Sequence, residues 1–240
     1  MTTITRNNIL IPVIARSNAA GSTAPWAVVF DGTTTKIFES NSATIQNLHD
    51  GAFTAEGWFK SESLPGTQAH CISKGVLGTT GWYLYYQATL LVAGAECATT
   101  DALATYGTTT MQSDETWYHL AMTWDDAGDR KVRLYVNRAL VATSGVGVGA
   151  VASDAALLLS IGNYSNLDRF FDGHVGWCRV SNVVRDIAAE TYTRDVPPAS
   201  DANTVRLFLM DEGDGTVIGD SSTNNSPATL ASGVWLRSGG

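Results

Sequence analysis

The chain has 240 residues, of which 44% are hydrophobic and 16% are charged, and its formal net charge is -8. With only 15 scattered lysines and arginines, this balance argues against a nucleic-acid partner, because binding to the phosphate backbone needs clustered cations. No run approaches the roughly 20 apolar residues of a membrane span, and the first residues lack the pattern of a Sec signal peptide.

Residues 1–25 are polar and irregular apart from "ILIPVI" (Ile9–Ile14), and we expect them to form an N-terminal arm. Such a segment cannot bury a core alone, because ordering each residue costs roughly 1–2 kcal/mol of backbone entropy. Two alternatives are open: the arm docks on its own domain, or it docks on a neighbouring subunit. Residues 26–240 are expected to form one domain.

Short strand-like segments recur through this domain. Each is rich in aromatic or β-branched side chains and is bounded by Gly, Asp, Asn or Thr, as strands between turns usually are. The segments are "WAVVF", "FTAEGWFK", "HCISKG", "GWYLYYQ", "TLLVAGAE", "ALLLSIGN" and "HVGWCRV". One short helix is expected at Arg185–Arg194, before Pro197.

The segment Trp117–Thr143 predicts a three-stranded antiparallel meander. Side chains alternate at period two on both sides of the turn-like "DDAGD", and Asn137-Arg138 makes a second tight turn. The apolar positions of one face, expected in the core, include Leu120, Met122, Leu134 and Val136. Many short strands with a single helical turn predict an all-β fold, a two-sheet antiparallel β-sandwich.

These segments together resemble the laminin-G-like (pentraxin-like) domain of the concanavalin A-like lectin/glucanase fold. The resemblance covers about Trp26–Glu190 and depends on "FDG", "TWYHLAMTWD", "VRLYVN" and "FFDG...CRV" in the family's order. It implies a concanavalin A-like jelly roll. Val175-Gly176-Trp177 stands where the family usually has Ile-Asp-Glu, so a role that depends on those acids does not transfer, whereas Arg179 is kept.

The tail Val205–Asn225 resembles a family segment that commonly precedes the core. Residues 205–240 are therefore expected to complete this sandwich or to pair with a neighbouring subunit. Three cysteines cannot all pair within one chain, and a Cys71–Cys97 disulfide requires their strands to be neighbours.

Candidate chemistry is sparse in this sequence. A retaining glycosidase of this fold needs paired carboxylates, and the chain has no E-x-D-x-E strand, so we predict that it is not an enzyme. Clustered oxygen ligands at Asp220, Asn224 and Asn225 predict a calcium site, with an Asx-rich turn without metal as the alternative. Tyr83 and Tyr85 share one strand face and are candidates for stacking on a sugar, or for a packed structural face.

Two functions follow from these observations. The first is a non-catalytic structural or interaction protein, such as a decoration or tail component of a virus-like particle, with other protein subunits as partners and a virion or extracellular location. The alternative is a glycan-binding module that uses calcium or works without it.

Overall fold

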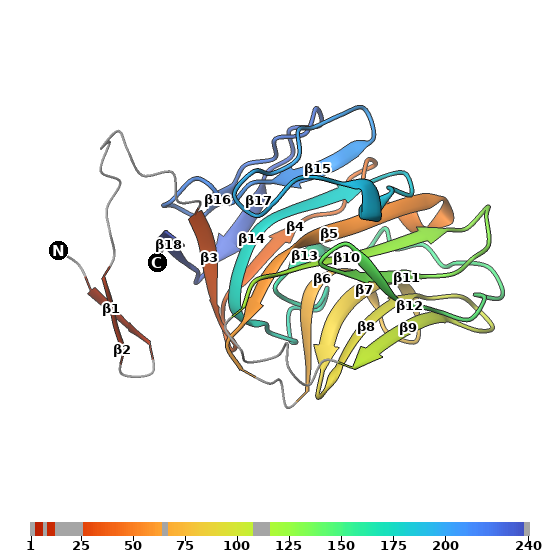
Figure 1. Cartoon of the computed structure of the whole chain (residues 1–240), viewed down its shortest axis with the longest axis horizontal. Helices are drawn as coiled ribbons and strands as arrows, with labels where there is room; N and C mark the ends of the chain where they lie inside the picture. The colour runs from red at the N-terminus through yellow and green to blue at the C-terminus, as the bar shows by residue number, and fades with distance from the viewer. Residues whose placement is uncertain (1–2, 7–8, 13–25, 64–66, 108–115, 238–240) are drawn as a thin grey trace.

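The computed structural model describes residues 3–6, 9–12, 26–63, 67–107 and 116–237, and within them two eight-stranded antiparallel sheets face one another (Figure 1). The β-sandwich expected from the sequence is confirmed. The main apolar core lies between the sheets and includes side chains of both, such as Phe30 of one sheet and Trp82 of the other.

The first sheet, called sheet 1 below, has the strand order β12-β11-β10-β5-β14-β3-β18, and β15 also pairs with β14. In this order the strands span Ala139–Thr143 (β12), Arg133–Val136 (β11), Tyr118–Asp125 (β10), Ala52–Ser61 (β5), Asp172–Ser181 (β14), Trp26–Asp31 (β3), Val234–Arg237 (β18) and Thr204–Phe208 (β15).

Sheet 2 has the order β16-β17-β4-β13-β6-β7-β8-β9. Its strands span Val217–Ile218 (β16), Ala228–Ala231 (β17), Lys36–Glu39 (β4), Leu159–Ile161 (β13), Gln68–Val76 (β6), Thr80–Gln87 (β7), Leu90–Ala95 (β8) and Ala102–Gly107 (β9). Two 3-10 turns complete the domain, η1 (Leu48–Asp50) and η2 (Ile187–Ala189).

The predicted meander is present as β10, β11 and β12. Leu120 pairs with Val136 and Met122 with Leu134, and these four side chains are between 0% and 8% exposed. Asn137 and Arg138 both have positive φ angles, 48° and 71°, as a two-residue type I′ turn requires. The stretch therefore serves as core scaffold.

One local expectation was wrong, and one open alternative is decided. The helix expected at Arg185–Arg194 is reduced to the three residues of η2, because the following backbone is held in a non-helical course by contacts to sheet 1, such as the bond from Trp177 Nε1 to Thr193 O at 2.9 Å. The condition for a Cys71–Cys97 disulfide also fails, since β7 lies between β6 and β8, and all three cysteines are free.

The two ends of the chain differ in their pairing. The C-terminal segment supplies β15 and β18 to sheet 1 and β16 and β17 to sheet 2 of its own chain. Of the N-terminal arm, the structure describes β1 (Thr3–Arg6) and β2 (Ile9–Pro12), which pair antiparallel with each other as a separate two-stranded sheet. The remaining residues of the arm lie outside the described part of the chain.

Candidate functional site

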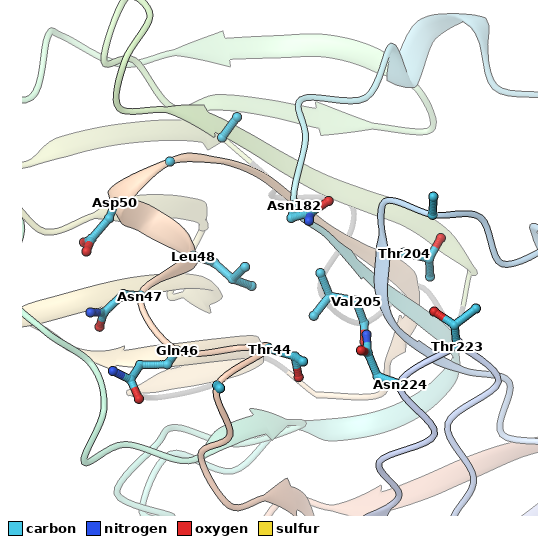
Figure 2. A pocket seen from close by; sticks show the side chains of 14 residues that line it. Thr44, Gln46, Asn47, Leu48, Asp50, Asn182, Thr204, Val205, Thr223 and Asn224 are labelled. Carbon is cyan, nitrogen blue, oxygen red and sulfur yellow. The ribbon is translucent and has the colours of Figure 1, made fainter.

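A groove of about 540 Å³ lies where the segment around η1 meets the C-terminal segment. Figure 2 shows Leu48 and Val205 pointing toward one another from its two sides. Its lining is mainly polar and uncharged and comes from four stretches of sequence. The lining residues are Ala43, Thr44, Gln46, Asn47, Leu48, Asp50, Gly51, Ala52, Asn182, Ala202, Thr204, Val205, Thr223 and Asn224.

The η1 wall is fixed from behind by buried charges. Asn47 adopts a left-handed conformation with φ 55°, and its backbone N–H donates to Asp154 Oδ1 at 2.7 Å, while its own Oδ1 accepts from the Asp154 N–H at 3.0 Å. Lys74 Nζ donates to the same carboxylate oxygen at 3.0 Å. Burial opposes ionisation of Asp154, but the His49 ring 3.5 Å away, the hydrogen bond from Asn47 and the Lys74 charge hold its pKa below the usual range. These buried contacts connect the η1 wall to sheet 2.

The opposite wall is organised by Asp220. Its Oδ1 accepts from the N–H groups of Leu207 and Ser222 at 3.0 and 2.9 Å, and its Oδ2 accepts from Ser222 Oγ and the Ser226 N–H at 2.7 and 3.0 Å. Asn224 Nδ2 donates to Val205 O at 3.0 Å, which places this side chain beside the groove.

These bonds bear on the predicted calcium site. Asp220 is buried and its two oxygens already accept four hydrogen bonds, whereas Asn224 and Asn225 are exposed. A calcium ion at these three residues would have to displace donors from Asp220. The site stays a prediction, and the geometry favours its alternative, an Asx-rich turn. Within the described ranges, no group of three or more His, Cys, Asp or Glu side chains could hold a metal ion.

The groove offers hydrogen-bonding groups around a small apolar surface. The exposed Asn182 contributes a carboxamide, Asn224 a carbonyl oxygen and Thr44 a hydroxyl, beside the half-buried Leu48, whereas Val205 behind them is only 4% exposed. Such groups match alternating hydroxyl and C–H surfaces of a small polar molecule. Sequence reasoning had singled out only Asn224 of this set.

The single ionisable side chain among the described lining residues is Asp50, which is exposed. Partial burial raises its pKa, and the nearby carboxylates of Asp154 and Asp126 act in the same direction, against the opposing effect of His49. The one charge that the described lining presents to a ligand is therefore that of the Asp50 carboxylate.

Tyr83 and Tyr85, the predicted stacking residues, do share the outer face of β7, but they are only 2% and 5% exposed. Tyr83 donates its hydroxyl to Glu96 Oε1 at 2.6 Å, and Tyr85 stacks on His70 with ring centroids 4.8 Å apart. Tyr164 also packs on His70, with ring centroids 4.6 Å apart. The cluster forms a small second core, and a sugar could stack on it only if these rings moved apart.

A second buried cluster, of charged and polar side chains that sequence reasoning had not brought together, lies on the outer face of sheet 1. Glu56 accepts from Arg179 Nε and from the Tyr192 hydroxyl, each at 2.6 Å, and lies 3.0 Å from His119 Nε2. Burial opposes ionisation of Glu56, but His119, Arg179 and Tyr192 hold its pKa below the usual range. Arg179, retained from the family pattern, thus fastens the segment that carries Tyr192 over the sheet.

The match to a family model covers residues 31–189, and the family is the concanavalin A-like lectin/glucanases superfamily. The chain belongs to this superfamily, and the laminin-G-like resemblance is confirmed. No curated protein matches the chain. No helix in the described ranges has the length and apolar character needed to cross a membrane.

Two solved structures are similar in fold. A "putative carbohydrate binding protein" from Bacteroides ovatus ATCC 8483 has 18% sequence identity and a TM-score of 0.64, over 89% of this chain and 60% of that one. Domains LG4-5 of the mouse laminin alpha1 chain have 14% identity and a TM-score of 0.51, over 67% of this chain and 42% of that one. This chain therefore spans less than two thirds of the length of either. Neither structure bears on a virus-like particle.

Proposed function

We propose that this protein is a lectin-like module that binds a carbohydrate in the groove between the η1 segment and the C-terminal segment, without catalysing a reaction. The observation that carries the proposal is the lining: carboxamide and hydroxyl groups surround the half-buried side chain of Leu48. The volume of about 540 Å³ is in the range of small-molecule sites. The superfamily and the fold of the Bacteroides protein support the proposal.

The test is carbohydrate binding by wild type and by variants of Asn182. This side chain is exposed and lines the groove, so its replacement leaves the fold intact. On a glycan microarray followed by calorimetry, we expect Asn182→Ala to weaken binding about tenfold, because removing one partner of a ligand hydrogen bond costs roughly 1–2 kcal/mol. Asn182→Trp, which fills the groove, should abolish binding.

The matched control is Asn166→Ala, which removes an exposed amide from a residue that does not line the groove. It should bind as wild type does. If wild type binds no glycan, or if Asn182→Trp binds as tightly as wild type, the groove is not a carbohydrate site.

A second candidate function, a subunit of a larger assembly, is supported by the hairpin of β1 and β2. These two strands form a sheet of their own, and an isolated two-stranded hairpin is at best marginally stable in water. A surface of another subunit would stabilise it. A decoration or tail component of a virus-like particle is one form that such an assembly could take.

Light scattering after size-exclusion chromatography tests this second candidate. We expect the full chain to form an oligomer, and deletion of residues 1–20 to give a monomer that still unfolds cooperatively. Equal native masses per chain for the two proteins would contradict the assembly role and leave carbohydrate binding unaffected.

A further inference from the structure

The chemistry of the groove also identifies a class of sugar. Resting on the proposed function, we infer that the groove binds neutral or amine-bearing sugars and rejects acidic ones, such as uronic acids and sulfated or sialylated chains. Among the described lining residues, the one ionisable side chain is the carboxylate of Asp50, and no Lys, Arg or His faces the groove.

Three cations of the described residues near the two walls are each paired with a carboxylate. Lys74, behind the η1 wall, is fully buried with three acceptors, and Arg206 is fully buried beside Val205. Arg185 lies three residues after Asn182, and its two terminal nitrogens donate to the two carboxylate oxygens of Asp201 at 3.0 and 2.7 Å. The pairs are Lys74 with Asp154, Arg206 with Glu39 and Arg185 with Asp201.

An acidic sugar would therefore enter without a counter-ion. Recognition of carboxylate or sulfate groups usually relies on Arg or Lys, which form short charge-assisted hydrogen bonds. Here such a group meets the carboxylate of Asp50, whereas the nearby carboxylates of Asp154 and Asp126 are each paired with a cation, Lys74 and Arg130. Repulsion from one like charge at contact distance near a protein surface lowers affinity on the order of tenfold. An ammonium group would instead be attracted to Asp50.

The experiment uses a microarray that prints each neutral chain beside its sulfated, sialylated and free-amine forms. Affinities for the best-bound set are then measured by calorimetry. We expect the neutral and amine-bearing forms to bind, and each acidic form to bind at least about tenfold more weakly than its neutral parent. Asp50→Lys should remove this difference, because it reverses the charge at the groove.

Asp214→Lys is the matched control, since it makes the same change of net charge at an exposed residue outside the lining. It should keep the wild-type preference. Acidic chains that bind as tightly as their neutral parents, or a preference that Asp214→Lys alters as much as Asp50→Lys does, would overturn the inference and leave the carbohydrate site standing. Failure of every printed chain to bind would remove the site and the inference together.

Discussion

Arg206 is the centre of a buried ion pair that fastens the C-terminal segment to sheet 2. The side chain is fully buried on β15, and it donates from Nε and Nη2 to the two oxygens of Glu39, on β4, at 2.8 and 2.6 Å. It also donates to Ser42 Oγ at 2.9 Å and to Val205 O at 2.6 Å. Replacing Arg206 therefore tests how the tail is held.

The substitution Arg206→Met keeps most of the buried hydrocarbon but removes the charge. Glu39, with a side chain only 5% exposed, then keeps Ser226 Oγ as a hydrogen-bond donor and loses its counter-ion. An uncompensated buried charge of this kind costs about 3–5 kcal/mol. The double substitution Glu39→Met with Arg206→Met removes both charges, and replacing a whole buried pair by apolar residues is often close to neutral. Asp220 keeps its four hydrogen bonds in both variants but loses the ion pair between its Oδ2 and Arg206 Nε at 3.8 Å. The double variant should therefore recover part of the stability that Arg206→Met loses.

The assay is urea unfolding followed by tryptophan fluorescence, with the midpoint and slope fitted together. The control is Arg133→Met, because Arg133 makes an equally short pair with Asp129 at 2.5 Å, but these side chains are 33% and 43% exposed. Its loss should cost less than about 1 kcal/mol. The reasoning is refuted if Arg206→Met costs no more than Arg133→Met, or if the double variant is as unstable as Arg206→Met alone.

Three further predictions concern acid, calcium and catalysis. Burial, with the charge of Arg169, lowers the pKa of His70 from 6.5 to about 3. Below pH 6.5 the unfolded chain therefore binds a proton at this group that the folded chain does not bind, and stability falls. From pH 7 to pH 5 the wild type should lose about 2 kcal/mol more stability than His70→Phe in urea unfolding, and equal losses would contradict this. Calcium added after EDTA treatment should leave the melting temperature unchanged, because Asp220 has no free lone pair to offer; a rise abolished by Asp220→Asn would establish the calcium site instead. A reducing-end assay with β-glucans should show no turnover, and turnover abolished by replacing the buried acid Glu96 would contradict a non-catalytic role.

The scaffold could be predicted from sequence because its signals are local. Alternation within Tyr118–Trp124 and Val132–Val136 determines which side chains share a face, and the turn residues between strands determine which strands are hairpin partners. The same reasoning correctly placed Tyr83 and Tyr85 together on one face. It could not show that this face is covered, because Tyr164 reaches it from a loop about 80 residues away.

The groove was not predictable in this way. Its walls come from residues 43–52, 182, 202–205 and 223–224, which lie far apart in the sequence and carry no motif that joins them. The Asp220 turn illustrates the difficulty, since a calcium loop and an Asx turn draw on the same oxygen-bearing residues. What distinguishes them is whether N–H groups such as that of Leu207 reach the carboxylate, and this depends on the folded arrangement of β15.

Two buried ion pairs stabilise the two walls of the groove, so the residues that maintain the fold differ from the residues that would contact a ligand. Lys74 and Asp154 fix the η1 wall, whereas Arg206 and Glu39 fix the strand that carries Val205. Substitutions at either pair should weaken folding and binding together, because they release a wall. Asn182 lines the same groove from an exposed position, so its replacement should affect binding alone. Since the buried charges are neutralised within the walls, the surface left for a ligand is one of amides, hydroxyls, aliphatic carbon and the single carboxylate of Asp50, which suits a neutral or amine-bearing sugar.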